Sequence, residues 1–258
     1  MLEYQSSNNM PSYRNTLDSY ESEVSSKYHI VNWSGGCDST LLLYELLKKY
    51  GPNRVKAVTY KYPYYDETKF MSEQMKRDQF KEFLKKENLD YFCHTTYKME
   101  CDNSKVWAQG GGNAQAPGWL MSLLYCQDGD YFYDTSIKND DLTIKNEDLK
   151  QAIEHLSNIL SRKIILRQPY LYFTKEYIIA KLIKYKIYKY TWYCEMPESV
   201  GKVCCKCEPC ALHTKSLAAL SIMANDPYVM EQAERLGRSN ISKYKKMRAN
   251  VNKEKEVK

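Results

Sequence analysis

Residues 34–40, with the sequence SGGCDST, separate a strand-like segment from a helical one. Residues 28–33 before them favour a strand, and the leucines that follow Asp38 recur at helical spacing until Gly51. The sequence therefore predicts a strand, a glycine turn and a helix in direct succession. At such a junction the backbone N–H groups and the positive end of the helix dipole form a site for an anion.

The same alternation of strand and helix patterns continues along the chain. Residues 54–60 and 91–96 are typical of strands, and residues 67–86 between them have the spacing of an amphipathic helix. The remaining predicted strands are 130–134 and 163–166, and the remaining predicted helices are about 119–127, 146–161, 175–185 after a Thr174 cap, 214–225, and a short one after Pro227. Because βαβ crossovers keep neighbouring strands parallel, we expect an α/β fold with a doubly wound, Rossmann-type parallel sheet.

Composition is that of a globular chain without membrane segments. Of the 258 residues, 43% are hydrophobic and 27% are charged, which permits one large core. The longest apolar runs are far shorter than the roughly 20 residues that cross a bilayer. Residues 1–27 are polar and have no signal-peptide pattern. We therefore expect a cytoplasmic protein that does not contact membranes.

The net charge of +6 is concentrated at the C-terminus. Residues 238–258 contain eight Lys and Arg residues against two Glu residues, so the rest of the chain is neutral. Such a tail could bind nucleic acid or an acidic partner, and the simpler interpretation is a solvated terminus. The predicted regions are an N-terminal extension (1–27), an α/β domain (28–190), a cysteine-containing helical region (191–230) and a basic tail (231–258).

Five of the nine cysteines lie within residues 194–210. In a cytoplasmic chain, clustered cysteines are metal ligands or reactive groups more often than disulfides. The spacing lets four thiolates surround one tetrahedral zinc ion, which is structural because four protein ligands leave no position for water. An iron–sulfur cluster and unliganded buried thiols are the alternatives. The predicted ligands are Cys194, Cys204, Cys207 and Cys210, which leaves Cys205 as a spare thiol.

The glycine turn has the chemistry of a pyrophosphate site. Its two glycines let the backbone approach an anion closely, and three hydroxyls can add donors. Asp38 would repel a bare phosphate, so its presence indicates that Mg²⁺ accompanies the phosphates. An incidental glycine turn before a capped helix is the alternative, and Cys37 is interpreted as a packing group rather than a nucleophile. The predicted binding residues are Ser34, Gly35, Gly36, Asp38, Ser39 and Thr40.

The SGGxDS string resembles the pyrophosphate-binding loop of the ATP pyrophosphatases, the PP-loop superfamily, which split ATP into AMP and pyrophosphate. The cysteine pattern is similar to the C-terminal zinc knuckle of one branch, the 7-cyano-7-deazaguanine synthase family. In that family a Thr-x-x-Cys, here Thr191 to Cys194, precedes Cys-Gly-x-Cys-x-x-Cys, and Cys205 stands at the glycine. The resemblance spans about residues 28–228 and includes three shorter matches, at Gln168-Pro169, Phe173-Thr174-Lys175 and Asp226-Pro227-Tyr228.

This resemblance implies an adenine nucleotide α-hydrolase-like fold with a four-cysteine zinc knuckle. It also implies an enzyme, an ATP-dependent carbon–nitrogen ligase. ATP would adenylate the carboxylate of 7-carboxy-7-deazaguanine, ammonia would displace AMP to give the amide, and a second ATP would activate that amide for dehydration to the nitrile. The implied cofactors are ATP, Mg²⁺ and structural Zn²⁺, and a homodimer is expected.

Three side chains receive more specific roles from the resemblance. Asp38 and Lys175 are the predicted catalytic residues, Asp38 through magnesium and Lys175 through a phosphate contact. A solvated lysine in the first turn of its helix is the alternative for Lys175. His213 stands where the family tends to have arginine, and we interpret it as a packing or supporting group of the knuckle rather than a catalyst.

Two stretches depart from the family pattern. The family has an Arg-Asn pair after its third strand, whereas residues 112–115 (GNAQ) keep only Asn113. It also has a Gly-Tyr-Pro-Asp-Cys-Arg string after its fourth strand, which residues 144–149 (IKNEDL) do not match. Both belong to the deazapurine pocket. The alternatives are therefore a PP-loop enzyme that adenylates a nucleic acid base or attaches a deazaguanine to another amine, and a non-catalytic nucleotide-binding protein.

Overall fold

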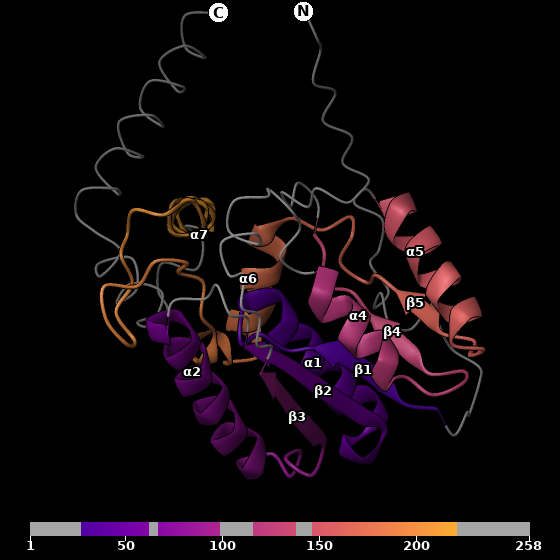
Figure 1. The fold of residues 1–258 in the computed structure, drawn as a ribbon. Helices are drawn as coiled ribbons and strands as arrows, with labels where there is room; N and C mark the ends of the chain where they lie inside the picture. Colours follow the sequence, from indigo (N-terminus) through magenta and orange to yellow (C-terminus); the bar gives the residue numbers. More distant parts are fainter. Residues whose placement is uncertain (1–26, 62–66, 99–115, 138–145, 221–258) are drawn as a thin grey trace, which may run out of the picture.

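The computed structural model describes residues 27–61, 67–98, 116–137 and 146–220, and the structural statements below concern these residues. They contain one five-stranded parallel sheet in the order β3-β2-β1-β4-β5 (Figure 1). The strands are β1 (His29–Asn32), β2 (Val55–Lys61), β3 (Cys93–Lys98), β4 (Tyr131–Tyr133) and β5 (Ile165–Arg167). The predicted α/β fold with a doubly wound parallel sheet is confirmed.

The strand order creates a switch point between β1 and β4. The chain builds the sheet outward from β1 through β2 to β3 and then returns to place β4 on the other side of β1. Val31 of β1 accordingly pairs with Ala57 of β2 on one side and with Tyr133 of β4 on the other. Open α/β sheets bind ligands outside the carboxyl ends of the strands at such a point. Residues 34–36, the glycine turn, follow β1 there.

Helices cover both faces of the sheet. Helices α1 (Cys37–Tyr50), α2 (Glu67–Lys86) and α6 (Lys175–Lys184) pack on one face, and α4 (Ala116–Tyr125) and α5 (Asn146–Ile159) on the other. The alternation of side chains along β1 explains both cores, since Val31 lies in the first and Ile30 in the second. Both residues are completely buried.

The last helix begins earlier than the sequence pattern indicates. The prediction of a helix at about 214–225 is wrong at its start, because α7 spans Glu208–Ala219 and begins directly after Cys207. Pro209 lies in its first turn, where a missing N–H costs nothing, but the cysteine spacing had suggested a loop there. The helix predicted after Pro227 lies outside the described residues.

Two short 3-10 turns were also missed, η2 (Pro52–Arg54) and η3 (Tyr188–Tyr190). Thr174 does occupy the N-cap position of α6, although no hydrogen bond of its side chain caps the helix. Among the described helices, none combines the length and the apolar character needed to cross a lipid bilayer.

Candidate phosphate loop and metal site

Two carbonyl groups of the glycine turn, those of Ser34 and Gly35, are held by distant parts of the protein. Nη1 of Arg77, from α2, donates to the carbonyl of Ser34, and the N–H of Trp192 donates to the carbonyl of Gly35 at 2.9 Å. In a trans peptide the following N–H points to the opposite side. The N–H of Gly35 therefore points away from Arg77 and that of Gly36 away from Trp192, where Oγ of Ser34 accepts it at 3.1 Å. Consecutive N–H groups directed in this way beside a helix N-terminus form a concavity that binds anions.

Gly35 is required by its backbone conformation and by its surroundings. Its φ is +94°, and a Cβ atom there would lie 3.1 Å from the carbonyl oxygen of Glu73 and 3.2 Å from Cγ of Arg77. A Cβ on Gly36 would meet Oγ of Ser34 at 3.1 Å, a side chain that can rotate away. Gly35 is thus the stricter of the two glycines.

The predicted hydroxyl groups divide into two sets. Ser34 and Ser39 remain at the turn, with their Oγ atoms 3.1 Å apart, and Oγ of Ser34 accepts the N–H of Gly36 at 3.1 Å. Thr40 is completely buried, and its hydroxyl accepts a hydrogen bond from Nε1 of Trp33 at 3.1 Å. The structure therefore places Thr40 in the support of the turn, while its predicted part in anion binding stays a prediction.

Asp38 and Lys175, the two predicted catalytic residues, form an ion pair. Oδ2 of Asp38 lies 2.6 Å from Nζ of Lys175, and the side chains are 24% and 16% exposed. They come from the first turns of α1 and α6. Lys175 is therefore paired and largely buried, unlike a solvated surface lysine.

The second oxygen of Asp38 marks a place for a cation. Oδ1 is buried and has no hydrogen-bond partner among the described residues. A buried carboxylate oxygen without a partner is costly, and magnesium prefers oxygen ligands of this kind. The residues present therefore fit a magnesium ion that arrives with phosphates.

Cys37 lies within the turn but has the environment of a packing residue. Its side chain is 1% exposed and belongs to the core beneath α1. Burial raises the pKa of the thiol above its ordinary value, which disfavours the nucleophilic thiolate. Its Sγ donates a hydrogen bond to Oγ1 of Thr191 at 3.4 Å. The interpretation of Cys37 as a packing group agrees with this environment.

Helix α2 buries three charged residues that the sequence pattern did not reveal as a buried group. Lys69, Glu73 and Arg77, called here the α2 charge row, are 5%, 6% and 0% exposed. The Glu73 carboxylate lies 3.8 Å from each of its two neighbours in the row. Charges repeated at every fourth position are usually a solvated helix face, so spacing alone gave no signal that this face is buried.

The charge row includes a carboxyl group that titrates near neutral pH. Burial raises the pKa of Glu73 from 4.5 to about 7, the charges of Lys69 and Arg77 oppose this shift, and Glu195 adds to it. The neutral form of Glu73 is thus favoured in the folded protein at mildly acidic pH. Below pH 4.5 this preference stabilises the fold fully, and the contribution is lost as pH rises toward 7.

We predict that Glu73→Gln makes the protein relatively more stable as pH rises. The difference in unfolding free energy between variant and wild type should grow by about 3 kcal/mol between pH 4.5 and pH 7. Urea unfolding of both proteins across this pH range measures that difference. A difference that falls with pH would mean that the ion pairs of Glu73 outweigh its burial.

The four predicted metal ligands meet at one point. Their sulfur atoms all lie within 4.8 Å of one another. Individual separations of Sγ atoms are 3.3 Å for Cys207 and Cys210, 3.5 Å for Cys194 and Cys204, and 4.0 Å for Cys194 and Cys207. Four thiols gathered in this way fit a bound metal ion.

Backbone groups support the cysteine sulfurs. The N–H groups of Lys206 and Cys207 donate to Sγ of Cys204 at 3.4 and 3.3 Å. Burial raises the pKa of Cys204, but hydrogen bonds from these N–H groups and from the Cys194 and Cys207 side chains lower it to about 7. Burial raises the pKa of Cys194 to about 11. Cys205 has a φ of +56°, the conformation that explains why glycine suits its position.

His213 is a buried packing group beside this site, as predicted. Its ring stacks on Tyr193 at a centroid distance of 3.7 Å and shares a hydrogen bond with the hydroxyl of Tyr188. Burial and the charge of Lys175 lower the pKa of His213 well below its usual value. The imidazole therefore stays neutral.

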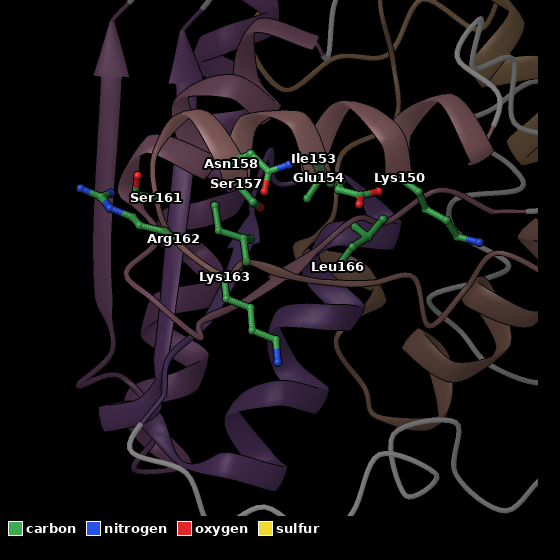
Figure 2. Close-up of a pocket in the computed structure, with 10 residues that line it drawn as sticks. Lys150, Ile153, Glu154, Ser157, Asn158, Ser161, Arg162, Lys163 and Leu166 are labelled. Atoms are coloured by element: carbon green, nitrogen blue, oxygen red, sulfur yellow. The ribbon is translucent and has the colours of Figure 1, made fainter.

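A surface groove lies elsewhere, between α5 and the segment that leads into β5. Figure 2 shows its lining, which includes Lys150, Glu154 and Arg162 around a volume of about 530 Å³. Arg162 donates to the carbonyls of Leu124 and Cys126 at 3.2 and 2.9 Å. None of the predicted site residues lines this groove, so it is not the candidate site.

The chain resembles several solved structures in its fold, but the comparisons assign it to no family. No family model and no curated protein matches the sequence. The U34-tRNA thiolase NcsA from Methanococcus maripaludis, with its [4Fe-4S] cluster, has a TM-score of 0.44 and 11% identity over 86% of this chain and 77% of its own. The NH₃-dependent NAD synthetase from Campylobacter jejuni, in complex with nitrate, has a TM-score of 0.39 and 14% identity over 88% of this chain and 90% of its own.

A third solved structure is longer than this chain. The glutamine-dependent NAD⁺ synthetase from Acinetobacter baumannii, in complex with ADP, has a TM-score of 0.32 and 14% identity. The match covers 81% of this chain and 39% of the synthetase. Likeness at these levels carries no information on substrate, and none of the three is a 7-cyano-7-deazaguanine synthase.

Proposed function

We propose that this chain is an ATP pyrophosphatase that activates a carboxylate by adenylation and transfers it to ammonia. The observation that carries the proposal is the glycine turn at the switch point, whose carbonyls are tied back by Arg77 and Trp192. The Asp38–Lys175 pair beside it adds a cationic group and a carboxylate oxygen without a partner among the described residues. Together these groups suit a magnesium-bound pyrophosphate better than a free monovalent anion.

The chain's own residues would act mainly by positioning charge. The N–H of Gly35, and that of Gly36 after Oγ of Ser34 rotates away from it, would bind the departing pyrophosphate oxygens. Lys175 would neutralise these oxygens further. Magnesium, held by Asp38, would lower the negative charge that repels the incoming carboxylate. No side-chain nucleophile is needed, which agrees with the buried thiol of Cys37.

The proposed acceptor is 7-carboxy-7-deazaguanine, and the sequence match around Lys175 and the cysteines supports it. The carboxylate oxygen would attack the α-phosphorus of ATP, releasing pyrophosphate and forming an acyl adenylate. Ammonia would then attack the acyl carbon and release AMP, leaving the amide. A second ATP would adenylate the amide oxygen, and loss of AMP with a proton would give the nitrile.

We also propose that the four-cysteine site holds zinc. Four thiolates on one zinc ion, at 2.3 Å each, stand about 3.8 Å apart in a tetrahedron. The described separations of 3.3, 3.5 and 4.0 Å scatter around that value. A [4Fe-4S] cluster holds each thiolate on a different iron and therefore needs the sulfurs farther apart.

The test is product analysis of the purified protein. The zinc-loaded protein is incubated with Mg-ATP, ammonium and 7-carboxy-7-deazaguanine, and products are identified by mass spectrometry. We expect AMP, pyrophosphate and a deazaguanine amide or nitrile, with one AMP per amide and two per nitrile. If ATP binds but AMP never forms, the chain is a nucleotide-binding protein. If AMP forms only with an added nucleic acid, the acceptor is a base and the proposed substrate is wrong.

A further inference from the structure

The two groups that hold the glycine turn both lead to the four-cysteine site. Trp192 is the first of them, and it lies two residues before Cys194 in the chain. Its backbone N–H binds the carbonyl of Gly35, and its indole Nε1 donates to the carbonyl of Cys194 at 2.7 Å. Gly36 and Trp192 also form an isolated parallel bridge. Cys194, one of the four cysteines, is therefore joined to the turn by the short segment 192–194, which two hydrogen bonds of Trp192 hold in place.

Arg77 is the second group, and the α2 charge row connects it to the same site. Arg77 contacts Glu73, Glu73 contacts Lys69, and Nζ of Lys69 donates to the carboxylate of Glu195. Glu195 follows Cys194 directly. Along this path basic and acidic side chains alternate, and Glu195 at its end is exposed to solvent.

A third contact fixes the loop between the first and second cysteine ligands to the same helix. The N–H of Gly201 donates to Oγ of Ser72 at 2.9 Å, and a Cβ atom on Gly201 would lie 3.0 Å from the terminal methyl of Met75. Residues 195–203 are thus held by a cysteine ligand at each end and by α2 in the middle. When the cysteines are not drawn together, this loop loses the anchors at both of its ends.

Buried charges are an expensive way to pack a helix. An apolar row of the same size would stabilise α2 as well or better, and buried ion pairs are best attested as devices that fix one arrangement. Here the arrangement they fix is the direction of the Ser34 carbonyl, and hence of the Gly35 N–H. If either carbonyl of the turn were released, its peptide could rotate and the two N–H groups would no longer point to one anion.

We propose that occupancy of the four-cysteine site controls the geometry of the glycine turn, with Arg77 and Trp192 as positioning residues that carry the effect. The inference rests on the proposed function only where it concerns nucleotide affinity. The metal site is then part of the phosphate-binding apparatus as well as a support for the C-terminal region. Arg77 contacts the loop backbone rather than the reacting atoms.

Hydrogen exchange of the full-length protein tests the coupling without any activity. Exchange of the peptide that covers residues 33–41 is compared in the zinc-loaded protein and after zinc removal by a chelator. Glu195→Gln, measured with zinc bound, breaks the link between Lys69 and the cysteine loop. Glu198→Gln is the matched control, because Glu198 lies in the same loop but pairs with Lys202 at the surface, at 2.6 Å.

We expect faster exchange of residues 33–41 after zinc removal, intermediate exchange in Glu195→Gln and wild-type exchange in Glu198→Gln. Mg-ATP affinity, measured by calorimetry, should fall roughly tenfold on zinc removal and severalfold in Glu195→Gln. If zinc removal unfolds the whole protein, as judged by circular dichroism, the zinc-bound Glu195→Gln variant decides the question. Wild-type exchange in that variant overturns the proposal.

Variants of Arg77 separate positioning from general stability. Arg77→Lys keeps one donor for the Ser34 carbonyl, whereas Arg77→Met keeps the bulk and loses the donor. Each variant is measured the same number of degrees below its own melting temperature. Under these conditions, exchange of residues 33–41 should be faster in Arg77→Met than in Arg77→Lys. Equal exchange in the two contradicts the role of the guanidinium. If exchange of residues 33–41 responds to zinc but the protein never binds ATP, the proposed function is wrong. The coupling between the four-cysteine site and the glycine turn is then still supported.

Discussion

Asp38→Asn is expected to reduce ATP-dependent AMP release by about a hundredfold or more. Asparagine keeps the size of the side chain but has no negative charge to hold a cation through the oxygen that lacks a partner among the described residues. The same change removes the 2.6 Å ion pair with Lys175. Rates of pyrophosphate release under saturating Mg-ATP, followed by a coupled phosphate assay, measure the effect.

Two controls separate lost chemistry from lost structure in this experiment. Asp78→Asn makes the same chemical change at an exposed site on α2, where the side chain accepts a hydrogen bond from Gln74 at 2.7 Å, and should keep the wild-type rate. Circular dichroism should show that Asp38→Asn folds normally. An Asp38→Asn protein that releases AMP at the wild-type rate would exclude Asp38 from the cation site.

The second large effect is expected from Cys210→Ser. Metal content, measured by mass spectrometry of the metal in the purified protein, should fall from one zinc per chain to nearly none. Because structural zinc contributes folding free energy directly, the melting temperature should fall by about 10 °C or more. Cys210 is completely buried, so the lost ligand cannot be replaced readily by water.

Cys205→Ser is the matched control for the metal site. Cys205 belongs to the same short loop and is half-buried, but it lies outside the group of four sulfurs that meet. This variant should keep one zinc ion and a melting temperature within a few degrees of the wild type. Iron in place of zinc, or metal retained in Cys210→Ser, would contradict the assignment of the four ligands.

Local signals explain how much of this fold the sequence predicts. The strand, glycine turn and α1 are encoded by adjacent residues. Helix α2 was predicted with its observed bounds, although most of its buried side chains are polar or charged. The four-cysteine site was predicted from spacing alone, since three of its ligands lie within seven residues. The start of α7 was missed because Cys207 and Cys210 belong to a metal site and to a helix N-terminus at once.

Contacts between distant residues explain what the sequence does not predict. Arg77 meets Ser34 across 43 positions, and nothing in a single sequence pairs them. In sequence, the α2 charge row resembles any solvated helix face. Only the folded structure shows that the segment around Cys194 contacts it. Thr40 was predicted to add a hydroxyl donor at the turn, and that role stays a prediction. Its complete burial and its hydrogen bond with Trp33 could not be read from the motif. Asn113, the retained residue of the altered pocket, lies outside the described residues.

The contact between Cys37 and Thr191 has a consequence for the order in which the protein is made. These residues are 154 positions apart, so a ribosome completes α1 long before it synthesises the segment that holds the glycine turn. Domains fold from the N-terminus as they emerge. A nascent chain therefore has the turn before it has Trp192. Under the proposed coupling, the turn would take its anion-binding geometry only after residues 194–210 are synthesised and bind a metal ion.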